Sequence, residues 1–513
     1  MVKLCFAMLV ASCLFAESSV AVRNGNLFVL TDEIDMSFEG FNVRSLRNTL
    51  TGEIYVSKPG PGWMDLSLQD PTSEFLRPGT WQLNTDPDTG LPAASIVATD
   101  SVRKVTLTVG VASGGKEVFF RLEASANRTG VRGLLWGMQG FDPAGRFVLP
   151  GQAGIYFDSR SPRSRLALEY PTHWEAQFAV YEAAKGSLLV YAQDPKPVFK
   201  RVQTSRELGT LDIGLEVFAT APWPAASNIP VIEWRLKAVA GNWRKAADEY
   251  RRWSDNVWAQ RVITPGLEWV RTIQSVIVVV DAQDNYLTLL AEKLNPKKTL
   301  LYLVNWRKDS YDVNYPDYTP ASGTADFVRK AKAMGFRTML HSSALGVAQY
   351  HPAYQDLKKY QLRNPEDEQL IFWPFGLWPG GSPPPEYLPS FAFISPAASA
   401  YRKMYLEAVA PAIETVQPDA LHLDAGGVLL NDSNGSIEGL NSIEGMVQLH
   451  KDLAARFPDL AFSYESMTEP VAGLQQLAQR WNSDHESHPI STYLMGDRVR
   501  FYGFLDQENP DEP

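Results

Sequence analysis

Two short stretches decide the fold: Leu421-His422-Leu423-Asp424-Ala425-Gly426-Gly427 and Leu460-Ala461-Phe462-Ser463-Tyr464-Glu465. Each is an apolar run that reaches a carboxylate, the pattern of a buried parallel strand whose last residue emerges from the sheet. Apolar residues between them recur at the spacing of one helix face: Met446, Leu449, Leu453 and Phe457. A strand–helix–strand unit of this kind places both carboxylates at the same edge of a parallel sheet.

The same alternation extends from about Trp269 to the C-terminus. It predicts helices that begin at Thr324, as a capping residue, and at Ser395-Pro396, because Pro is favoured at the first helical position. It predicts strands over Ser275–Val280, Leu300–Val304, Thr338–Leu340, Ala420–Leu423 and Leu460–Ser463. No Gly-rich phosphate loop follows the first strand, so we expect a TIM-type (β/α)₈ barrel rather than a doubly wound sheet. Only five strands, or at most six, are recognisable, which predicts a barrel that is C-terminally incomplete or irregular.

The first part of the chain has a different pattern. Lys104–Val109 and Phe120–Ala124 alternate polar and apolar residues on either side of a Gly-containing turn, which predicts a hairpin. Similar short segments recur, and many short strands with turn signals favour an antiparallel β-sandwich. Asn242–Trp258 has apolar residues on one helical face. We therefore expect a signal peptide at 1–21, a β-sandwich domain at 23–240, a linker helix at 241–265 and the barrel at 266–513.

Two carboxylates at the ends of neighbouring strands suit the retaining mechanism of glycoside hydrolases. Adjacent strands lie about 4.8 Å apart, so their terminal carboxyls can reach the roughly 5–5.5 Å separation of that mechanism. One ionised carboxylate attacks the anomeric carbon. The other protonates the leaving oxygen and then activates water, and the like charge of the first helps to raise its pKa. Asp424 is the candidate nucleophile and Glu465 the candidate acid/base. Two structural alternatives stay open, a helix cap or turn for Asp424 and an ion pair for Glu465.

The chain also resembles a known group of enzymes. A galactose-mutarotase-like sandwich, a helix such as Trp243–Trp253 and a barrel resemble bacterial glycoside hydrolases related to the endo-α-N-acetylgalactosaminidases, distant relatives of the α-amylase barrel. The resemblance covers most of residues 25–510. It rests on the Asp424 and Glu465 segments, on Trp306 with Tyr315-Pro316-Asp317-Tyr318, and on Ser395-Pro396. It implies a retaining α-glycosidase with its nucleophile after strand four and its acid/base after strand five, which match Asp424 and Glu465 by position. The α configuration follows from the resemblance alone.

The sequence departs from the amylase pattern at two places. That barrel has an Arg two residues before its nucleophile, where this chain has His422. We expect His422 to hydrogen-bond the nucleophile or the substrate, or to fill the barrel. The amylase pattern also includes a stabilising Asp after strand seven, for which Asp484 and Asp497 are candidate substitutes.

Sugar binding calls for aromatic platforms and for polar partners of the hydroxyls, and residues after several strand ends supply them. The substrate-binding candidates are Trp306, Asp312, His341, His422, Trp373 and Trp378. Trp373 and Trp378 belong to a long loop rich in Pro and Gly, and loops of this length are often functional. The alternative is that these aromatic residues pack the loops onto the barrel or the sandwich.

The N-terminal segment predicts export. Lys3 precedes an apolar run over Leu4–Leu14, which is too short to span a bilayer, and small residues follow. Val10-Ala11-Ser12-Cys13 resembles the lipobox, in which the Cys is lipidated, whereas Ser19-Val20-Ala21 suits ordinary signal cleavage. We expect a secreted, periplasmic or cell-envelope protein that is attached to a membrane only if Cys13 is lipidated.

The composition of the chain limits the kinds of partner and cofactor that we expect. The 513 residues carry a formal net charge of −10, which argues against a nucleic-acid partner. The only two cysteines, Cys5 and Cys13, lie in the export segment, so we expect neither a thiol nucleophile nor a cysteine-based metal site. Because the histidines are scattered as well, we expect no transition-metal site. No cofactor is expected, and a structural Ca²⁺ on the sandwich stays open. The predicted function is hydrolysis of a glycan or oligosaccharide. The alternatives are a non-catalytic carbohydrate-binding envelope protein with a degenerate barrel and a transglycosylase with the same carboxylate pair.

Overall fold

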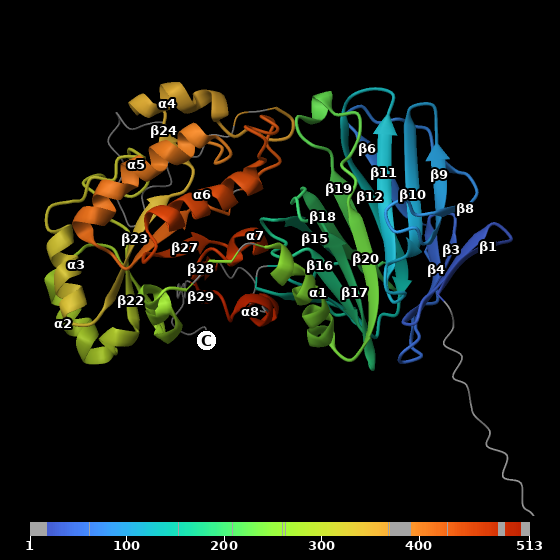
Figure 1. Ribbon diagram of the computed structural model, residues 1–513, viewed down its shortest axis with the longest axis horizontal. Coiled ribbons are helices and arrows are strands. Elements are labelled where there is room, and N and C mark those ends of the chain that lie inside the picture. The colour runs from blue at the N-terminus through green and yellow to red at the C-terminus, as the bar shows by residue number, and fades with distance from the viewer. Residues whose placement is uncertain are drawn as a thin grey trace, which may run out of the picture.

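The computed structural model has a β-rich N-terminal half and an α/β C-terminal half, with helix α1 (Trp243–Val257) where the two halves meet (Figure 1). It describes residues 18–60, 62–151, 153–207, 209–258, 260–261, 263–367, 369, 391–427, 429–480 and 488–503. This arrangement confirms the expected order of an antiparallel sandwich followed by a parallel barrel.

Two antiparallel sheets of ten strands each form the sandwich. The first contains β1 (Ser19–Arg23), β2 (Asn26–Leu30), β3 (Ile34–Glu39), β4 (Asn42–Asn48), β5 (Ile54–Val56), β6 (Trp63–Leu68), β12 (Val131–Phe141), β15 (Arg165–Tyr170), β18 (Lys200–Ser205) and β19 (Leu211–Phe218). The second contains β7 (Arg77–Pro78), β8 (Gln82–Thr85), β9 (Pro92–Thr99), β10 (Arg103–Val111), β11 (Val118–Ala126), β13 (Arg146–Leu149), β14 (Ile155–Phe157), β16 (Phe178–Glu182), β17 (Gly186–Gln193) and β20 (Glu233–Ala240).

The alternation seen in the sequence corresponds to the two faces of each sheet. The predicted hairpin is confirmed, because β10 and β11 pair in antiparallel register from Arg103 opposite Ala126 to Val111 opposite Val118. Large aromatic side chains fill the space between the sheets. The rings of Trp174 and Trp234 stack at 6.3 Å, and the Phe120 ring lies between Trp234 and Trp136. This core supports the side of the barrel.

Seven parallel strands form a nearly closed barrel sheet, and they follow one another in sequence order. They are β21 (Ser275–Val279), β22 (Thr299–Leu303), β23 (Arg337–Ser343), β26 (Ala420–Asp424), β27 (Ala461–Glu465), β28 (Leu477–Arg480) and β29 (Arg500–Gly503). The sequence revealed only five of them, because β28 and β29 are four residues long and half polar. A short antiparallel pair, β24 (Gly346–Ala348) and β25 (Phe391–Phe393), lies outside this sheet.

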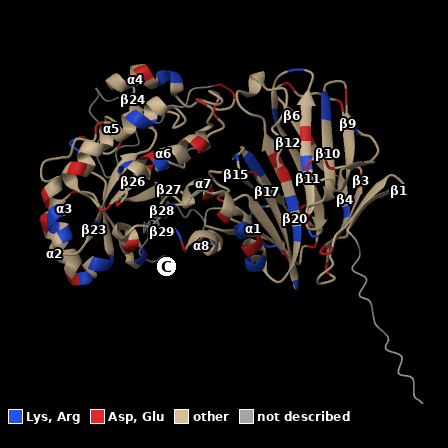
Figure 2. Cartoon of the chain, viewed as in Figure 1, with Lys and Arg blue, Asp and Glu red and all other residues tan. Residues whose placement is uncertain are grey.

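Helices connect these strands. They are α2 (Asp284–Lys293), α3 (Thr324–Ala333), α4 (Pro352–Leu357), α5 (Ser399–Val416), α6 (Ser442–Arg456), α7 (Glu469–Ala472) and α8 (Ile490–Met495). Charged residues of both signs lie along the outer helices α2 and α3 (Figure 2). Within the described ranges, no helix has the length and apolar character needed to cross a membrane.

Helix α3 begins at Thr324 as predicted, although another residue occupies its capping position, and the second predicted helix start is wrong. Thr324 does not cap α3, because its hydroxyl donates to the carbonyl of Trp306 and Gly323 occupies the capping position. Helix α5 begins at Ser399 rather than at Ser395-Pro396. In the preceding turn the amide of Ala398 donates to the Ser395 carbonyl.

Strand β1 includes the end of the segment expected to be a signal peptide. Ser19, Val20 and Ala21 pair with Leu30, Val29 and Phe28 of β2. A cut after Ala21 would therefore remove three of the five residues of this strand.

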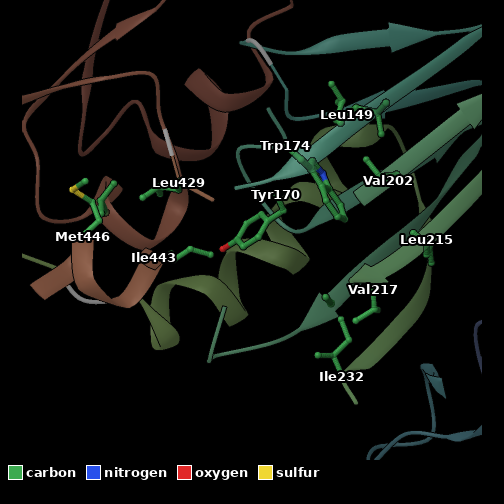
Figure 3. Packing of buried hydrophobic residues seen from close by; sticks show 14 of the residues in the cluster. Leu149, Tyr170, Trp174, Val202, Leu215, Val217, Ile232, Leu429, Ile443 and Met446 are labelled. Carbon is green, nitrogen blue, oxygen red and sulfur yellow. The ribbon is translucent and has the colours of Figure 1, made fainter. Parts of the chain in front are cut away.

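An apolar seam joins the two halves. One continuous cluster of buried side chains runs from the sandwich into the barrel. Figure 3 shows Leu429, Ile443 and Met446 of the barrel half beside Tyr170 of the sandwich. Burial of this much apolar surface favours a fixed relationship between the halves.

Charged groups also cross the seam. Glu175 of the sandwich half is 5% exposed and accepts hydrogen bonds from Arg480, at 2.9 Å, and from the Ser491 hydroxyl. Glu469 of α7 accepts a hydrogen bond from the Tyr250 hydroxyl of α1, and burial raises its pKa to about 7. The first contacts join Glu175 to β28 and α8, and the second joins α7 to α1.

Replacing Arg480 with Ala should lower the free energy of unfolding by about 3 kcal/mol, because it leaves the buried carboxylate of Glu175 without its counter-charge. Urea denaturation followed by fluorescence measures the change. Arg456→Ala is the matched control, since Arg456 forms an ion pair with Glu414 in which both side chains are more than half exposed. Its effect should stay below about 1 kcal/mol. Equal losses in the two variants would contradict a special role for the seam pair.

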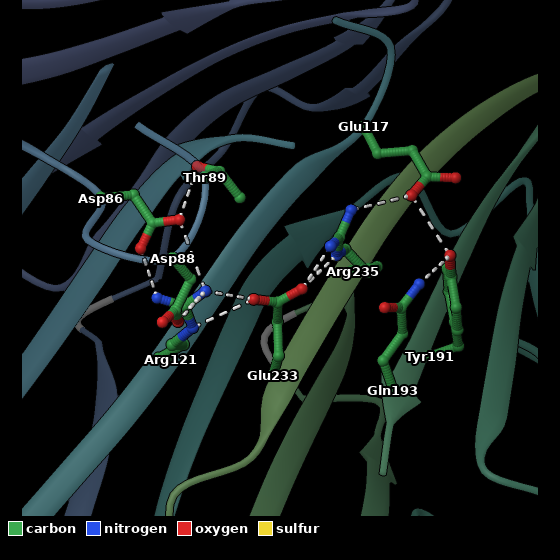
Figure 4. Close-up of polar contacts among 9 residues, drawn as sticks. All are labelled: Asp86, Asp88, Thr89, Glu117, Arg121, Tyr191, Gln193, Glu233 and Arg235. Carbon is green, nitrogen blue, oxygen red and sulfur yellow. Dashed lines mark hydrogen bonds and ion pairs between the residues drawn. The ribbon is translucent and has the colours of Figure 1, made fainter. Parts of the chain in front are cut away.

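The outer face of the second sheet carries a network of ion pairs (Figure 4). Arg121 of β11 binds Asp86 and Glu233, and Arg235 of β20 binds Glu233 and Glu117. Lys237 extends the network to Glu249 of α1. The network therefore fastens the helix between the halves to the sheet beneath it.

Candidate active site

Two neighbouring strands of the barrel deliver the two principal carboxylates. Asp424 is the last residue of β26, and Glu465 is the last residue of β27. The strands are parallel neighbours, with Leu423 opposite Tyr464. The structure therefore brings the two side chains together at the carboxyl edge of the sheet, as their positions in the sequence predicted.

The backbone turns sharply after each of these carboxylates. Ala425 has φ 57° and Ser466 has φ 70°, both in the left-handed region that non-glycine residues rarely adopt. The turn after Asp424 aims the Ala425 amide at Glu465, whose Oε2 accepts its hydrogen bond at 2.8 Å. Backbone strain of this kind costs about 1–3 kcal/mol per residue and clusters at functional sites.

The small residues after Asp424 have a structural cause. A Cβ at Gly426 would collide with the Tyr464 ring. A Cβ at Gly427 would lie 2.8 Å from the hydroxyl oxygen of Ser466. The two glycines therefore allow the Glu465 strand end to pack against the Asp424 turn.

Asp312 supplies a third carboxylate. It follows β22, has φ 59° and is 7% exposed. Burial raises its pKa to about 7; the charge of Arg307 opposes the shift and that of Glu465 adds to it. The earlier candidate Asp497 is wrong for this role, because it is half exposed and pairs with Arg251 of α1. Asp484 lies outside the described residues.

Arg307 shapes the loop that carries Asp312. It is 4% exposed, and its guanidinium donates to the carbonyls of Ser310, Val313 and Asp317. It also lies 4.2 Å from the centre of the Tyr315 ring. A buried guanidinium with these partners holds the loop in one shape and leaves a positive charge near Asp312.

The three carboxylates act on one another. Burial raises the pKa of Asp424 well above its usual value, and the charges of Glu465 and Asp312 add to the shift. The sequence predicted repulsion within the carboxylate pair, and in the structure the charge of Glu465 adds to the raised pKa of both Asp424 and Asp312. Groups that interact this strongly lose their protons in coupled steps.

Two histidines lie beneath Asp424. His341 of β23 and His422 of β26 are fully buried, and their Nε2 atoms lie 3.9 Å from Oδ2 and Oδ1 of Asp424. The three residues bring potential metal ligands within 4.8 Å of one another. His341 was predicted to bind substrate, and His422 to hydrogen-bond the nucleophile or the substrate or to fill the barrel. The polar group that both histidines face most directly is the Asp424 carboxylate.

Several residues of the site were missed by the sequence analysis. The Tyr302 hydroxyl lies 2.7 Å from His341 Nδ1, and Ser463 Oγ lies 2.9 Å from His422 Nδ1. Tyr502 of β29 contacts both Ser463 and His422. The sequence carried one indication of these residues, because Tyr302 and Ser463 are polar side chains that interrupt apolar stretches of their strands.

The predicted sugar platform at Trp306 is wrong. Trp306 is fully buried, its ring stacks parallel to that of Tyr318 at 6.3 Å, and its indole N–H donates to the His341 carbonyl. An indole packed in this way has no face to offer a sugar. Trp373 and Trp378 lie outside the described residues.

Part of the sequence matches a family model, and the fold is similar to that of solved structures. A family model described as a domain of unknown function (DUF6259) matches residues 232–432, a range that includes Asp312 and Asp424. No curated protein matches the sequence.

Solved structures of the α-N-acetylgalactosaminidase NagBb from Bifidobacterium bifidum have a similar fold. Its ligand-free structure aligns with a TM-score of 0.69 at 12% identity, covering 94% of this chain and 85% of that one. Its GalNAc complex aligns at 0.68 and its Gal-NHAc-DNJ complex at 0.69, each at 12% identity and covering 94% of this chain and 83% of that one. This likeness shows that the sandwich and the barrel share their arrangement with NagBb.

Proposed function

We propose that this protein is a retaining glycoside hydrolase, with Asp424 as the nucleophile and Glu465 as the general acid/base. The observation that carries the proposal is the 2.8 Å hydrogen bond from the Ala425 amide to Glu465 Oε2. This bond holds the Glu465 carboxylate against the peptide that follows Asp424. A pair held this closely favours the short separation of retaining enzymes over the roughly 6.5–9.5 Å of inverting enzymes.

The proposed reaction has two displacements at the anomeric carbon. The Asp424 carboxylate forms a bond to this carbon while the bond to the leaving oxygen breaks, and the proton of Glu465 passes to that oxygen. Glu465 then removes a proton from water, which attacks the same carbon and releases Asp424. The product keeps the anomeric configuration of the substrate.

The substrate contacts are also proposals. Asp312 has a buried Oδ1 with no protein partner among the described residues, so it is suited to bind a sugar hydroxyl. We retain Trp373 and Trp378 as candidate aromatic platforms. The α configuration stays a proposal, supported by the fold shared with the α-N-acetylgalactosaminidase NagBb. The mutarotase-like character of the sandwich and the relation to endo-α-N-acetylgalactosaminidases also stay proposals. No catalytic step requires a cofactor, and the structural Ca²⁺ stays a proposal.

A panel of aryl α- and β-glycosides tests the proposed activity. Proton NMR of the first product should show hydrolysis of one α-glycoside with retained configuration. Products that carry a sugar acceptor in place of water would identify a transglycosylase. Inverted product would contradict the mechanism. Absence of turnover in a folded protein that still binds glycans would favour the alternative of a carbohydrate-binding envelope protein.

We further propose that the protein is exported and that processing leaves β1 whole. Loss of Ser19, Val20 and Ala21 would expose the edge of β2. Mass spectrometry of the exported protein should therefore find an N-terminus before Ser19, either after Ala16 or at a lipidated Cys13. A mature chain that begins at Val22 would contradict the expected intact strand. Detergent-phase partitioning separates the two accepted outcomes, since only the lipidated form associates with membrane.

A further inference from the structure

Two buried nitrogen atoms beneath Asp424 lack partners. Within the described part of the chain, neither His341 Nε2 nor His422 Nε2 makes a hydrogen bond, although both side chains are fully buried. An unpaired polar atom in a protein interior costs about 1–3 kcal/mol. Both atoms are directed at the same carboxylate, one toward each of its oxygens.

The hydroxyl groups around the imidazoles determine which nitrogen carries the proton. The Tyr302 phenol has His341 Nδ1 as its one hydrogen-bond partner among the described residues, so donation to that nitrogen is the arrangement that gives the phenol proton an acceptor. Ser463 and Tyr502 lie 2.7 Å apart, and both contact His422 Nδ1. Both hydroxyl protons are satisfied when one hydroxyl donates to the other and the second donates to Nδ1. In each neutral imidazole the proton is therefore on Nε2, facing Asp424.

We propose that His341 and His422 form a two-imidazole cradle that donates an N–H to each oxygen of Asp424, and that this cradle orients the nucleophile and favours its ionised form. The proposal rests on the proposed function, because it assigns the two histidines to the nucleophile of that reaction. It makes them positioning residues that act through Asp424.

The electrostatics of the cradle suit a nucleophile. Burial lowers the pKa of His422 to about 3, and burial together with the neighbouring His422 and Arg307 lowers that of His341 well below its usual value. Both rings are therefore neutral at neutral pH. Neutral N–H donors stabilise the buried carboxylate without forming an ion pair that would withdraw its charge. The 3.9 Å separations are longer than hydrogen bonds, and such contacts commonly tighten when the substrate binds.

A metal ion is the competing occupant of this cluster. It would coordinate both Nε2 atoms and so require the ring protons to move to Nδ1. The Tyr302 hydroxyl would then face a donor and lose the acceptor for its own proton. The hydroxyl network consequently favours the cradle over a metal site.

The charge of Asp424 depends on every group around it. Glu465 and Asp312 raise its pKa, and hydrogen-bond donors lower it. The titratable and charged groups that face this cluster are Tyr302 of β22, His341 of β23, His422 of β26, Glu465 of β27, Tyr502 of β29 and, after β22, Arg307, Tyr311, Asp312 and Tyr315. Removing the imidazole donors should therefore raise the pKa of Asp424 further and move the acid limb of the rate profile to higher pH.

The test compares Leu and Gln at each histidine. His341→Leu and His422→Leu should lower kcat by about 100-fold with little change in KM, as expected for a donor that acts mainly in the transition state. The acid limb of kcat/KM should rise by about one pH unit. His341→Gln and His422→Gln keep an N–H near the position of Nε2 and should recover most of both effects. His450→Leu is the matched control, because His450 is equally buried but lies on α6 with Nδ1 bonded to the Met446 carbonyl.

The outcomes separate the cradle from its alternatives. Leu variants that lower the melting temperature as His450→Leu does, without moving the acid limb, would overturn it. In an Asp424→Ala background, His422→Leu should lower the residual rate no further. Activity that survives Asp424→Ala would instead refute the proposed function. Stoichiometric Co²⁺ binding that disappears in His341→Gln would overturn the cradle in favour of a metal site.

Discussion

Replacement of Asp424 with Ala should lower kcat by about 10⁴-fold or more on any glycoside that the protein hydrolyses. The variant removes the group that forms the bond to the anomeric carbon, and loss of a nucleophile is among the largest single effects in enzymes. The fold should survive, because Asp424 is the last residue of β26 and its side chain is 20% exposed. Steady-state kinetics and a thermal melt on the same preparation measure both.

Azide supplies a control for the Asp424 variant. In the space left by the carboxylate, azide should attack the anomeric carbon, form a carbon–nitrogen bond and displace the leaving group. A nucleophile on that face inverts the configuration, so an α-glycoside should yield a β-glycosyl azide. Azide should restore turnover in Asp424→Ala and should not raise the rate of His450→Leu, which keeps its carboxylate nucleophile, and this contrast would identify the face from which Asp424 acts. An α-azide would show that another group is the nucleophile.

Trapping the glycosyl-enzyme intermediate identifies the nucleophile by an independent measurement. A 2-deoxy-2-fluoro glycoside with a good leaving group should add the mass of one fluorosugar to the wild-type protein. Peptide mapping should place the adduct within 420–424. An adduct at Glu465 would reverse the two roles.

The sequence allowed the position of the site to be predicted, because parallel strands impose a strong regularity. In a parallel barrel, an apolar strand that ends in a carboxylate places that carboxylate at the carboxyl edge of the sheet. The sequence alone therefore allowed Asp424 and Glu465 to be predicted as a pair. The short strands β28 and β29 could not be recognised, since four residues with two polar side chains carry too little periodicity.

The interior of the site was less predictable, because burial depends on which way a side chain points. Trp306 and Asp312 belong to the same loop after β22, yet Trp306 packs into the core while Asp312 faces the carboxylates. The direction of Asp312 is set by the hydrogen bonds of Arg307 and by a backbone angle in the left-handed region, and that of Trp306 by the bond from its indole to the His341 carbonyl. Neither these hydrogen bonds nor this backbone angle can be inferred from the residue types. The hydroxyl partners of the histidines come from three different strands, so no local motif could reveal them.

Glu465→Ala should lower the rate by an amount that depends on the leaving group. An unactivated glycan needs a proton on its departing oxygen, so its kcat should fall by about 10³–10⁴-fold. A dinitrophenyl glycoside leaves without a proton, and its first step should change little. Its second step still lacks the base that activates water, so the glycosyl-enzyme should accumulate and appear as a burst of dinitrophenolate.

Glu465→Gln distinguishes the chemical role from the structural one. A Gln side-chain oxygen can still accept the hydrogen bond of the Ala425 amide, but the amide neither donates a proton to the leaving group nor removes one from water. If Glu465 is the acid/base, the Gln variant should be as slow as Ala on unactivated glycans, and azide should speed its second step while retaining configuration. If Glu465 only holds the Ala425 turn, Gln should restore activity and Ala should lose it for both kinds of substrate. Because one hydrogen bond joins the two carboxylates, this comparison separates the geometry of the pair from the protons that it moves.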